Sequence, residues 1–319
     1  MSDFTTPADH DSPWKEALEH FFPDFLALLF PAVFDAVDWR RAPAFLDKEL
    51  QKVVRDAEDG RRHADKLIRV HTLEGHETWV LIHVEVQGEP ERAFAERMFR
   101  YYYRLRDRYA VDVVSLAVLA DTSPSFRPRG FRLERWGCWN EFRFPTVKLI
   151  DFMAPDRWAE LEASDNRFAL VVMAQLRAKL SHDADELKGW KFRLVRSMYD
   201  RGYERGDILE LFRIIDWMIS LPEGLEALFR EEVYRFEEEQ KMPYVTTVER
   251  AGIEKGLEQG LEQGRLHGEA AVLLRQIAQK FGAEAAERHR ERIEQADAET
   301  LLEWSERILA ADTVEALFH

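Results

Sequence analysis

The stretch DKLIRVHTLEGHETWVLIHVEVQ, residues 65–87, decides the fold that we expect for this chain. It contains two runs rich in β-branched and apolar residues, 65–71 and 78–87, on either side of a polar segment around Gly75. Two such runs flanking a short turn that contains glycine are typical of a β-hairpin. The sequence therefore predicts an antiparallel hairpin whose turn is centred on Gly75.

This hairpin would bring two carboxylates together at the end of an apolar strand. A turn centred on Gly75 places Asp65 directly across from Glu85, and opposed residues lie about 4.5–5.5 Å apart at Cβ. Like charges placed so destabilise a sheet, whereas a divalent cation such as Mg²⁺ binds carboxylate and backbone oxygens. The spacing alone leaves two interpretations open: a metal site, or polar strand ends that reach solvent.

Several sequence runs resemble a nuclease family. Asp65, followed some twenty residues later by Glu85-Val86-Gln87, resembles the PD-(D/E)xK nuclease core in its E-x-Q form. More narrowly, four runs resemble the Rpn family, recombination-promoting nucleases also described as putative transposases: FLDKEL (45–50), ADKLIRV (64–70), WVLIHVEVQ (79–87) and FAERMFRYYYRLRDRY (94–109). The resemblance covers residues 14–150, and residues 250–319 are similar to a C-terminal domain of unknown function.

The resemblance implies a fold and an activity. The fold is an α/β restriction-endonuclease-like core, a mixed central β-sheet flanked by helices, followed by an all-helical C-terminal region. The activity is Mg²⁺- or Mn²⁺-dependent hydrolysis of DNA phosphodiester bonds with little sequence preference, in recombination, mobile-element or defence contexts. Two alternatives are a catalytically inactive nuclease fold that binds nucleic acid or protein, and a transposase proper, for which the chain offers no strand-transfer feature.

Each residue of the resembled motif then has an expected role. Asp65 and Glu85, with the backbone carbonyl of Val86, would hold the metal, and Gln87 would orient the attacking water. Glu49, in the FLDKEL run, would be an additional acidic ligand or would hydrogen-bond to a ligand. The chain departs from the parent motif at Gln87, where a lysine usually stands, and a glutamine supplies no positive charge.

The composition is that of an ordinary globular protein with an uneven charge. The chain has 319 residues, 46% of them hydrophobic and 33% charged, and a single cysteine, Cys138, which excludes an internal disulfide. No secretory signal and no apolar run long enough to cross a membrane is evident, so we expect a cytoplasmic location. Of the net charge of −15, residues 1–150 carry −3, and ten arginines stand against five acidic residues between Arg92 and Arg135. Such a local basic region is typical of contact with nucleic-acid phosphates.

Part of that basic region falls on a predicted helix, 92–109. Helical spacing puts an apolar face on one side of it. Beside that face lies a stripe of arginines, Arg97, Arg100, Arg104 and Arg108. Arginine stems that surround a buried helix face explain the stripe, and so does a clamp on the DNA backbone, with Arg97 or Tyr101 nearest the chemistry.

The remaining pattern divides the chain into segments. We expect a disordered tail at 1–12, the nuclease-like core at 13–150 with further strands at 111–120, 131–136 and 141–150, and a helical segment at 151–245 that either packs on the core or forms its own domain. Cys138 is expected to be a buried apolar residue, and His83 a packed core residue. The last segment, 246–319, begins with glycines at every fourth position from 252 to 268. They indicate either a close helix seam in a homo-oligomer or a soft connector.

Overall fold

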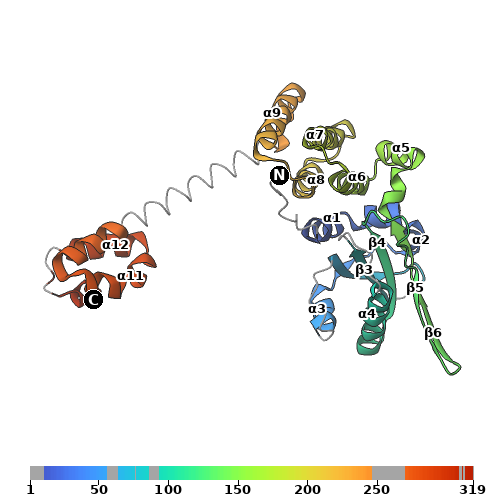
Figure 1. Ribbon diagram of the computed structural model, residues 1–319, viewed down its shortest axis with the longest axis horizontal. Helices are drawn as coiled ribbons and strands as arrows, with labels where there is room; N and C mark the ends of the chain where they lie inside the picture. Colours follow the sequence, from blue (N-terminus) through green and yellow to red (C-terminus); the bar gives the residue numbers. More distant parts are fainter. Residues whose placement is uncertain are drawn as a thin grey trace. The chain divides into compact units, whose positions relative to one another are not determined.

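The expected hairpin lies in the middle of a five-stranded mixed β-sheet (Figure 1). Its strands, in spatial order, are β1 (Ala44–Phe45), β2 (Ala64–His71), β3 (Glu77–Glu85), β4 (Asp112–Leu119) and β7 (Thr146–Lys148). The first three strands pair antiparallel, and β3, β4 and β7 pair parallel. The prediction of an α/β fold with a mixed central sheet is confirmed.

This computed structural model describes residues 11–55, 64–75, 77–85, 93–245, 270–308, 311 and 313–318. The chain forms two compact units, Met1–Val245 and Thr246–His319. The glycine repeat at 252–268 and the N-terminal tail lie outside the described residues. The sheet belongs to the first unit.

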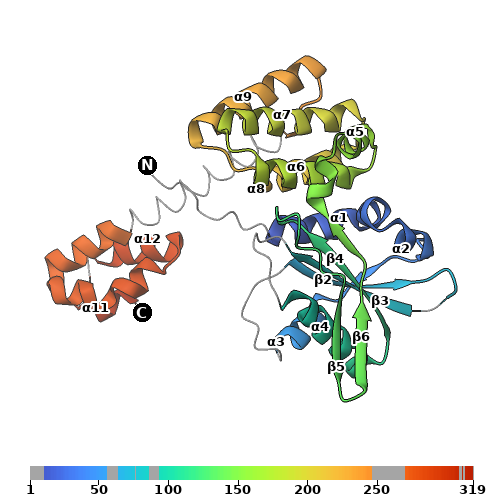
Figure 2. The same ribbon diagram turned by 45° about the vertical axis from the view of Figure 1, so that its right-hand side comes forward.

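Helices cover both faces of the sheet (Figure 2). On one face lie α3 (Asp47–Arg55) and α4 (Phe94–Tyr109), whose side chains form an apolar core with Leu67 and Trp79. The predicted apolar face of α4 is confirmed, since its members Phe94, Met98, Tyr101 and Leu105 are buried. On the other face lies α1 (Asp11–Leu29), followed by the short α2 (Pro31–Ala36).

A layer of helices packs on the side of α1 that faces away from the sheet. The layer contains α5 (Pro155–Ala163), α6 (Arg167–Leu180), α7 (Ala184–Asp200), α8 (Arg205–Met218) and α9 (Glu223–Gln240), and it is joined to β7 by the 3₁₀ turn η1 (Leu149–Met153). The side chains of Phe25 in α1, Val118 in β4 and Phe168 in α6 belong to one continuous core. Of the two alternatives for this segment, packing on the core is therefore the one observed.

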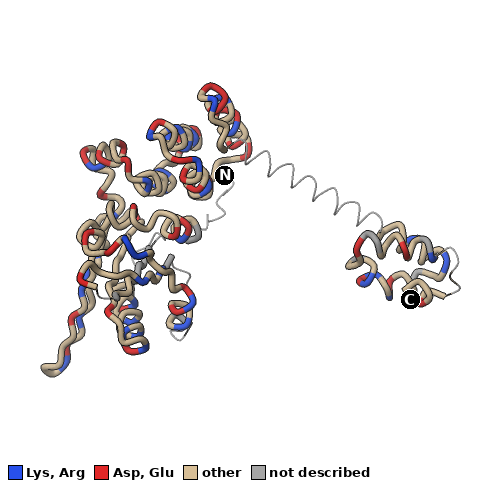
Figure 3. Tube along the Cα trace, turned by 180° about the vertical axis from the view of Figure 1, so that it is seen from behind, with Lys and Arg blue, Asp and Glu red and all other residues tan. Residues whose placement is uncertain are grey.

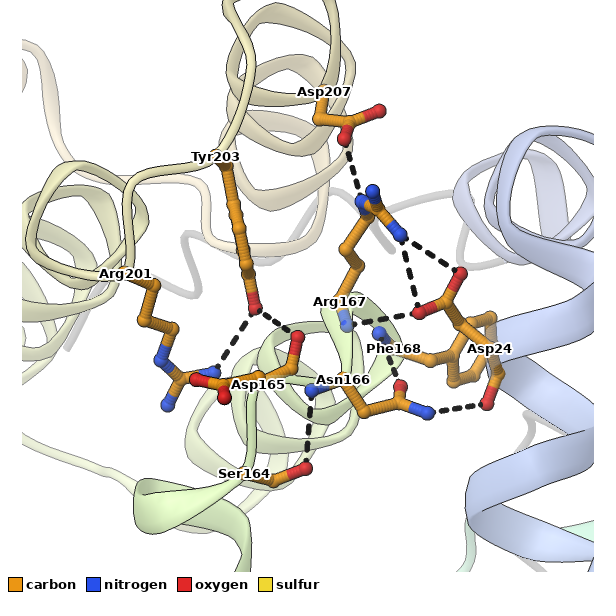
Figure 4. A network of polar contacts seen from close by, with 9 residues as sticks. All are labelled: Asp24, Ser164, Asp165, Asn166, Arg167, Phe168, Arg201, Tyr203 and Asp207. Carbon is orange, nitrogen blue, oxygen red and sulfur yellow. Dashed lines mark hydrogen bonds and ion pairs between the residues drawn. The ribbon is translucent and has the colours of Figure 1, made fainter.

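The layer begins with a polar contact to α1 (Figure 4). The Nε of Arg167 donates to Asp207 at 2.5 Å, and its Nη1 lies 3.4 Å from the Asp24 carboxylate. Asn166 caps α6 by accepting from the Phe168 backbone N–H, and its side-chain amide donates to the backbone carbonyl of Asp24. The extended backbone of Ser164 and Asn166 separates α5 from α6, because a capping residue has extended rather than helical backbone angles.

A two-stranded hairpin, β5 (Gly130–Arg135) with β6 (Cys138–Arg143), projects beyond α4 (Figures 1 and 2). We call it the arm. Two expectations were wrong here. Cys138 is exposed, because it follows the arm's turn and no core reaches that far. The single strand expected at 141–150 is two strands, β6 and β7, because Pro145 between them has no N–H to donate to a sheet.

The second unit has its own small core. Residues 270–281 are helical, and α11 (Ala283–Glu294), α12 (Ala298–Arg307) and the 3₁₀ turn η2 (Glu315–Phe318) follow. Leu273, Ile293, Leu301 and Trp304 are among its buried side chains. Most of the described residues of this unit are helical.

The shared core has a testable consequence for unfolding. Phe168 is fully buried and packs on Trp14 and Phe25 of α1, with ring centres 5.5 and 5.1 Å away. We expect Phe168→Ala to lower the free energy of unfolding by about 3–5 kcal/mol, and Leu228→Ala, on the exposed surface of α9, to change it by less than about 0.5 kcal/mol. Amide hydrogen exchange should show that protection of the sheet and of α6–α8 falls together. Lower protection of the helices alone would contradict one shared core.

Candidate functional site

The strand pairing corrects the predicted position of the two carboxylates. In the β2–β3 hairpin Asp65 pairs with His83 and Ala64 with Val84, so Asp65 does not lie directly across from Glu85. The reason is the turn, in which the Gly75 N–H donates to the Thr72 carbonyl at 2.8 Å. Gly75 is the last residue of that turn, the position glycine favours in a type I turn, and the hairpin is centred one residue before it.

The corrected register still keeps the two positions together. Alternate residues of a strand share a face, so positions 65, 83 and 85 lie on the same face of the sheet, and 65 and 85 are diagonal neighbours. Diagonal pairs in an antiparallel sheet are about 7–8 Å apart. Val86 and Gln87 lie outside the described residues, as do the side chains of Asp65 and of 81–85.

Glu85 ends β3 at an edge where three parallel strands end. It pairs with Leu119 of β4, and Leu119 pairs with Lys148 of β7, so positions 85, 119 and 148 form one row across the sheet. In open α/β sheets, ligands bind outside the carboxyl ends of parallel strands. The edge that carries Glu85 is therefore the edge at which a ligand site is expected.

A buried ion pair lies at this edge, and sequence reasoning missed it. The Nζ of Lys148 is 2.5 Å from Oδ1 of Asp121, two residues after the end of β4, and the two side chains are 2% and 1% exposed. The same oxygen accepts from the Ser123 backbone N–H at 2.9 Å. The Lys148 ammonium also lies 5.7 Å from the centre of the Phe126 ring. The sequence does not predict this pair, because Lys148 and its partner in the loop are 27 positions apart and no local spacing connects them.

An exposed ion pair holds the loop that carries Phe126. Arg127 donates from both terminal nitrogens to Asp151, at 2.7 and 2.5 Å, and its Nε donates to the Pro124 carbonyl. The hydrogen bonds from Arg127 lower the pKa of the Asp151 carboxyl from its usual value. The pair is therefore ionised at neutral pH, and it joins the segment before the arm to η1.

The strand position next to Asp65 is fixed from the opposite face of the sheet. Lys66 is buried, and its ammonium pairs with Glu19 of α1 and with Asp47 of α3, the latter at 2.7 Å. A buried ammonium with two carboxylate partners resists any slip of the strand, because a slip would leave its charge unpaired. Of the two acidic residues in the FLDKEL run, Asp47 has a described ion pair with the hairpin. Glu49 is half-buried in the same helix.

The predicted arginine stripe on α4 makes contacts within the chain. Arg97 and Tyr101 are buried, and the Arg97 guanidinium lies 5.6 Å from the Phe94 ring centre. Arg104 donates to the Val53 carbonyl at 3.2 Å. Arg100 lies 3.4 Å from Glu96, and Arg108 stacks near Tyr109. The exposed surface of the stripe is thus smaller than its four arginines suggest, and contact with nucleic acid stays a prediction.

Three comparisons with known proteins add no relative: no protein-family model, no curated protein and no solved structure matches this chain. Among the side chains that the structure describes, no three His, Cys, Asp or Glu residues are grouped as metal ligands. In the same part of the chain, no helix combines the length and the apolar character needed to span a bilayer.

The Asp121–Lys148 pair yields a stability prediction. Asp121→Asn removes one charge of a buried pair, so we expect a loss of about 3–5 kcal/mol in the free energy of unfolding. Asp121→Leu combined with Lys148→Met removes both charges and should cost less than Asp121→Asn alone. Asp151→Asn, which breaks the exposed pair with Arg127, is the matched control and should cost at most about 1 kcal/mol. Urea titration measures all three, and equal losses for Asp121→Asn and Asp151→Asn would contradict the assignment.

Proposed function

We propose that this chain is a Mg²⁺- or Mn²⁺-dependent DNA endonuclease of the PD-(D/E)xK type and a member of the Rpn family. The observation that carries the proposal is the backbone register, which puts positions 65 and 85 on one face at the carboxyl edge of the sheet. The order α1, α2, β1, α3, β2, β3, α4, β4 supports it as well, because helices followed by a hairpin, a helix and a buried strand are the layout of the resembled nuclease core. The sequence resemblance over residues 14–150 is the third support.

The donor set at this edge fits a hard divalent cation. Asp65, Glu85 and the backbone carbonyl of Val86 are all oxygen donors, which Mg²⁺ and Mn²⁺ prefer. These three groups would hold the ion, with Glu49 as a further acidic group from α3. When bound, such an ion lowers the pKa of a coordinated water and neutralises charge on the phosphate.

The other residues of the site would position the substrate and the water. Gln87 is two positions after Glu85 in the sequence, so an extended backbone would put it on the same face, where its side-chain amide would hydrogen-bond to the attacking water. The exposed Arg108 and the half-buried Arg100 and Arg104 of α4 would contact backbone phosphates, which fix the position of DNA without reading its sequence. This arrangement suits hydrolysis with little sequence preference.

The biological setting follows from the family resemblance rather than from the site. Recombination, mobile elements and defence are the contexts in which a nuclease without strong sequence preference acts on DNA. We also propose that residues 246–319 serve a protein partner, with a second copy of this chain as the partner expected from the glycines at 252–268. A cytoplasmic location fits each of these settings.

Cleavage of DNA tests the proposal. We expect Asp65→Asn and Glu85→Gln each to lower the rate of Mg²⁺- or Mn²⁺-dependent cleavage by at least about a hundredfold, because changes even outside a metal's ligand set cost 10- to 100-fold. Asp112→Asn, an exposed carboxylate at the opposite end of β4, should cleave like the wild type. Gel assays on plasmid, linear duplex and single-stranded DNA and on RNA identify the substrate. Wild-type rates in both site variants would end the proposal.

Metal binding distinguishes the nuclease from the second candidate, an inactive nuclease fold that works as an interaction module. At a hundredfold excess over its Kd, a bound ion stabilises the folded state by about 2.7 kcal/mol. We therefore expect Mn²⁺ to raise the Tm of the wild-type protein by a few degrees and to leave that of Asp65→Asn unchanged. An unchanged Tm in the wild type would favour the inactive module.

A further inference from the structure

The turn at the tip of the arm has an unusual residue in it. Trp136 and Gly137, which connect β5 to β6, have φ values of 51° and 82°. A two-residue hairpin turn with two positive φ angles is a type I′ turn, in which Asn-Gly is strongly preferred. A bulky residue in this conformation is uncommon, because its Cβ crowds the backbone.

Packing does not offset that conformational cost. The Trp136 side chain is 94% exposed, and the described contact of its ring is with the Arg135 guanidinium, 4.9 Å from the ring centre. Two neighbours are also apolar and exposed, Trp139 at 64% and Leu133 at 61%. Strained residues that add nothing to packing are concentrated at functional sites. The arm therefore presents an aromatic tip to a partner.

Charge indicates what kind of partner. In a chain of net charge −15, the arm (130–143) carries three arginines and two glutamates, two further arginines stand at 127 and 129, and Figure 3 shows basic and acidic residues along the arm. Arg132 and Arg143 pair with Glu134 and Glu141, and such exposed pairs contribute little stability, so phosphates can replace the carboxylates. A groove of about 610 Å³ at its base is lined in part by Arg129, Arg132 and Arg143. Arginines along a strand pair with an aromatic end fit a polyanion that also offers flat apolar surfaces, which is the chemistry of a nucleic acid.

We propose that the arm binds double-stranded DNA along a groove and inserts Trp136 between neighbouring base pairs. A two-stranded β-ribbon can enter the major or the minor groove, and an apolar side chain that enters a base step from the minor groove unstacks it and bends the duplex. The arginines of the arm then contact phosphates on either side. This inference rests on the proposed function, because DNA is the substrate there, and it names the double-stranded form as the one held.

A single substitution separates the binding role of the tip from its fold. Trp136→Asn gives the turn its preferred Asn-Gly sequence, so the arm folds at least as well as in the wild type. With a fluorescent 20-base-pair duplex in EDTA, where no metal-dependent cleavage occurs, we expect anisotropy to show a Kd about tenfold higher for Trp136→Asn. Leu73→Ala, in the β2–β3 turn and as exposed as Leu133, should bind like the wild type. Arg135→Ala should lower the slope of log Kd against log salt by about one.

A second readout reports the insertion itself. A duplex that carries 2-aminopurine becomes brighter when the base is unstacked, so the wild type should raise its fluorescence and Trp136→Asn should not. Equal duplex affinity for the two proteins would overturn the proposal. So would a Trp136→Asn effect confined to single strands, or one that appears in sedimentation as loss of a dimer. These experiments omit metal, so their outcome does not depend on whether the Asp65 and Glu85 variants cleave DNA. Failure of the proposed nuclease activity and failure of the proposed role of Trp136 can therefore be told apart.

Discussion

The register of the β2–β3 hairpin is the constraint on which the rest of the site depends. A slip of one residue would move every side chain of a strand to the opposite face of the sheet. Lys66 opposes such a slip, because its buried ammonium pairs with Glu19 of α1 and Asp47 of α3, while the next residue, Leu67, packs in the core formed with α3 and α4. The same packing therefore fixes position 65 on the face that carries Glu85.

The parallel pairing of β3, β4 and β7 then determines what surrounds that position. It brings the carboxyl ends of three strands to one edge and puts the Asp121–Lys148 pair in the row of Glu85. The helical layer packs behind the sheet, because Phe25 of α1 belongs to one continuous core with Val118 of β4 and Phe168 of α6. Positions 65 and 85 thus lie on a sheet whose apolar core extends into the helical layer.

Sequence patterns predicted the local elements well and their ends less well. Alternation and β-branched runs located β2, β3, β4 and β5, and helical patterns located α4 and the helical segment after residue 150. The errors fell where one backbone group decides the outcome: the Gly75 hydrogen bond to Thr72 and the missing N–H of Pro145. Contacts between distant segments leave no local pattern, so neither the Asp121–Lys148 pair nor the burial of Arg97 could be anticipated. The exposure of Cys138 in the arm was not predicted, because residues 136–139, Trp-Gly-Cys-Trp, are mostly apolar, although Gly137 is a turn residue.

The most direct measurement is the position of a bound metal. Crystals of the protein with Mn²⁺ and a short DNA duplex, measured at the manganese absorption edge, show the ion as an anomalous difference peak. The account predicts a peak within about 2.5 Å of carboxylate oxygens from both Asp65 and Glu85, at the end of β3 beside the row that contains Lys148. A peak bound by other residues, or density that leaves these two carboxylates on separate ions or on none, would contradict it.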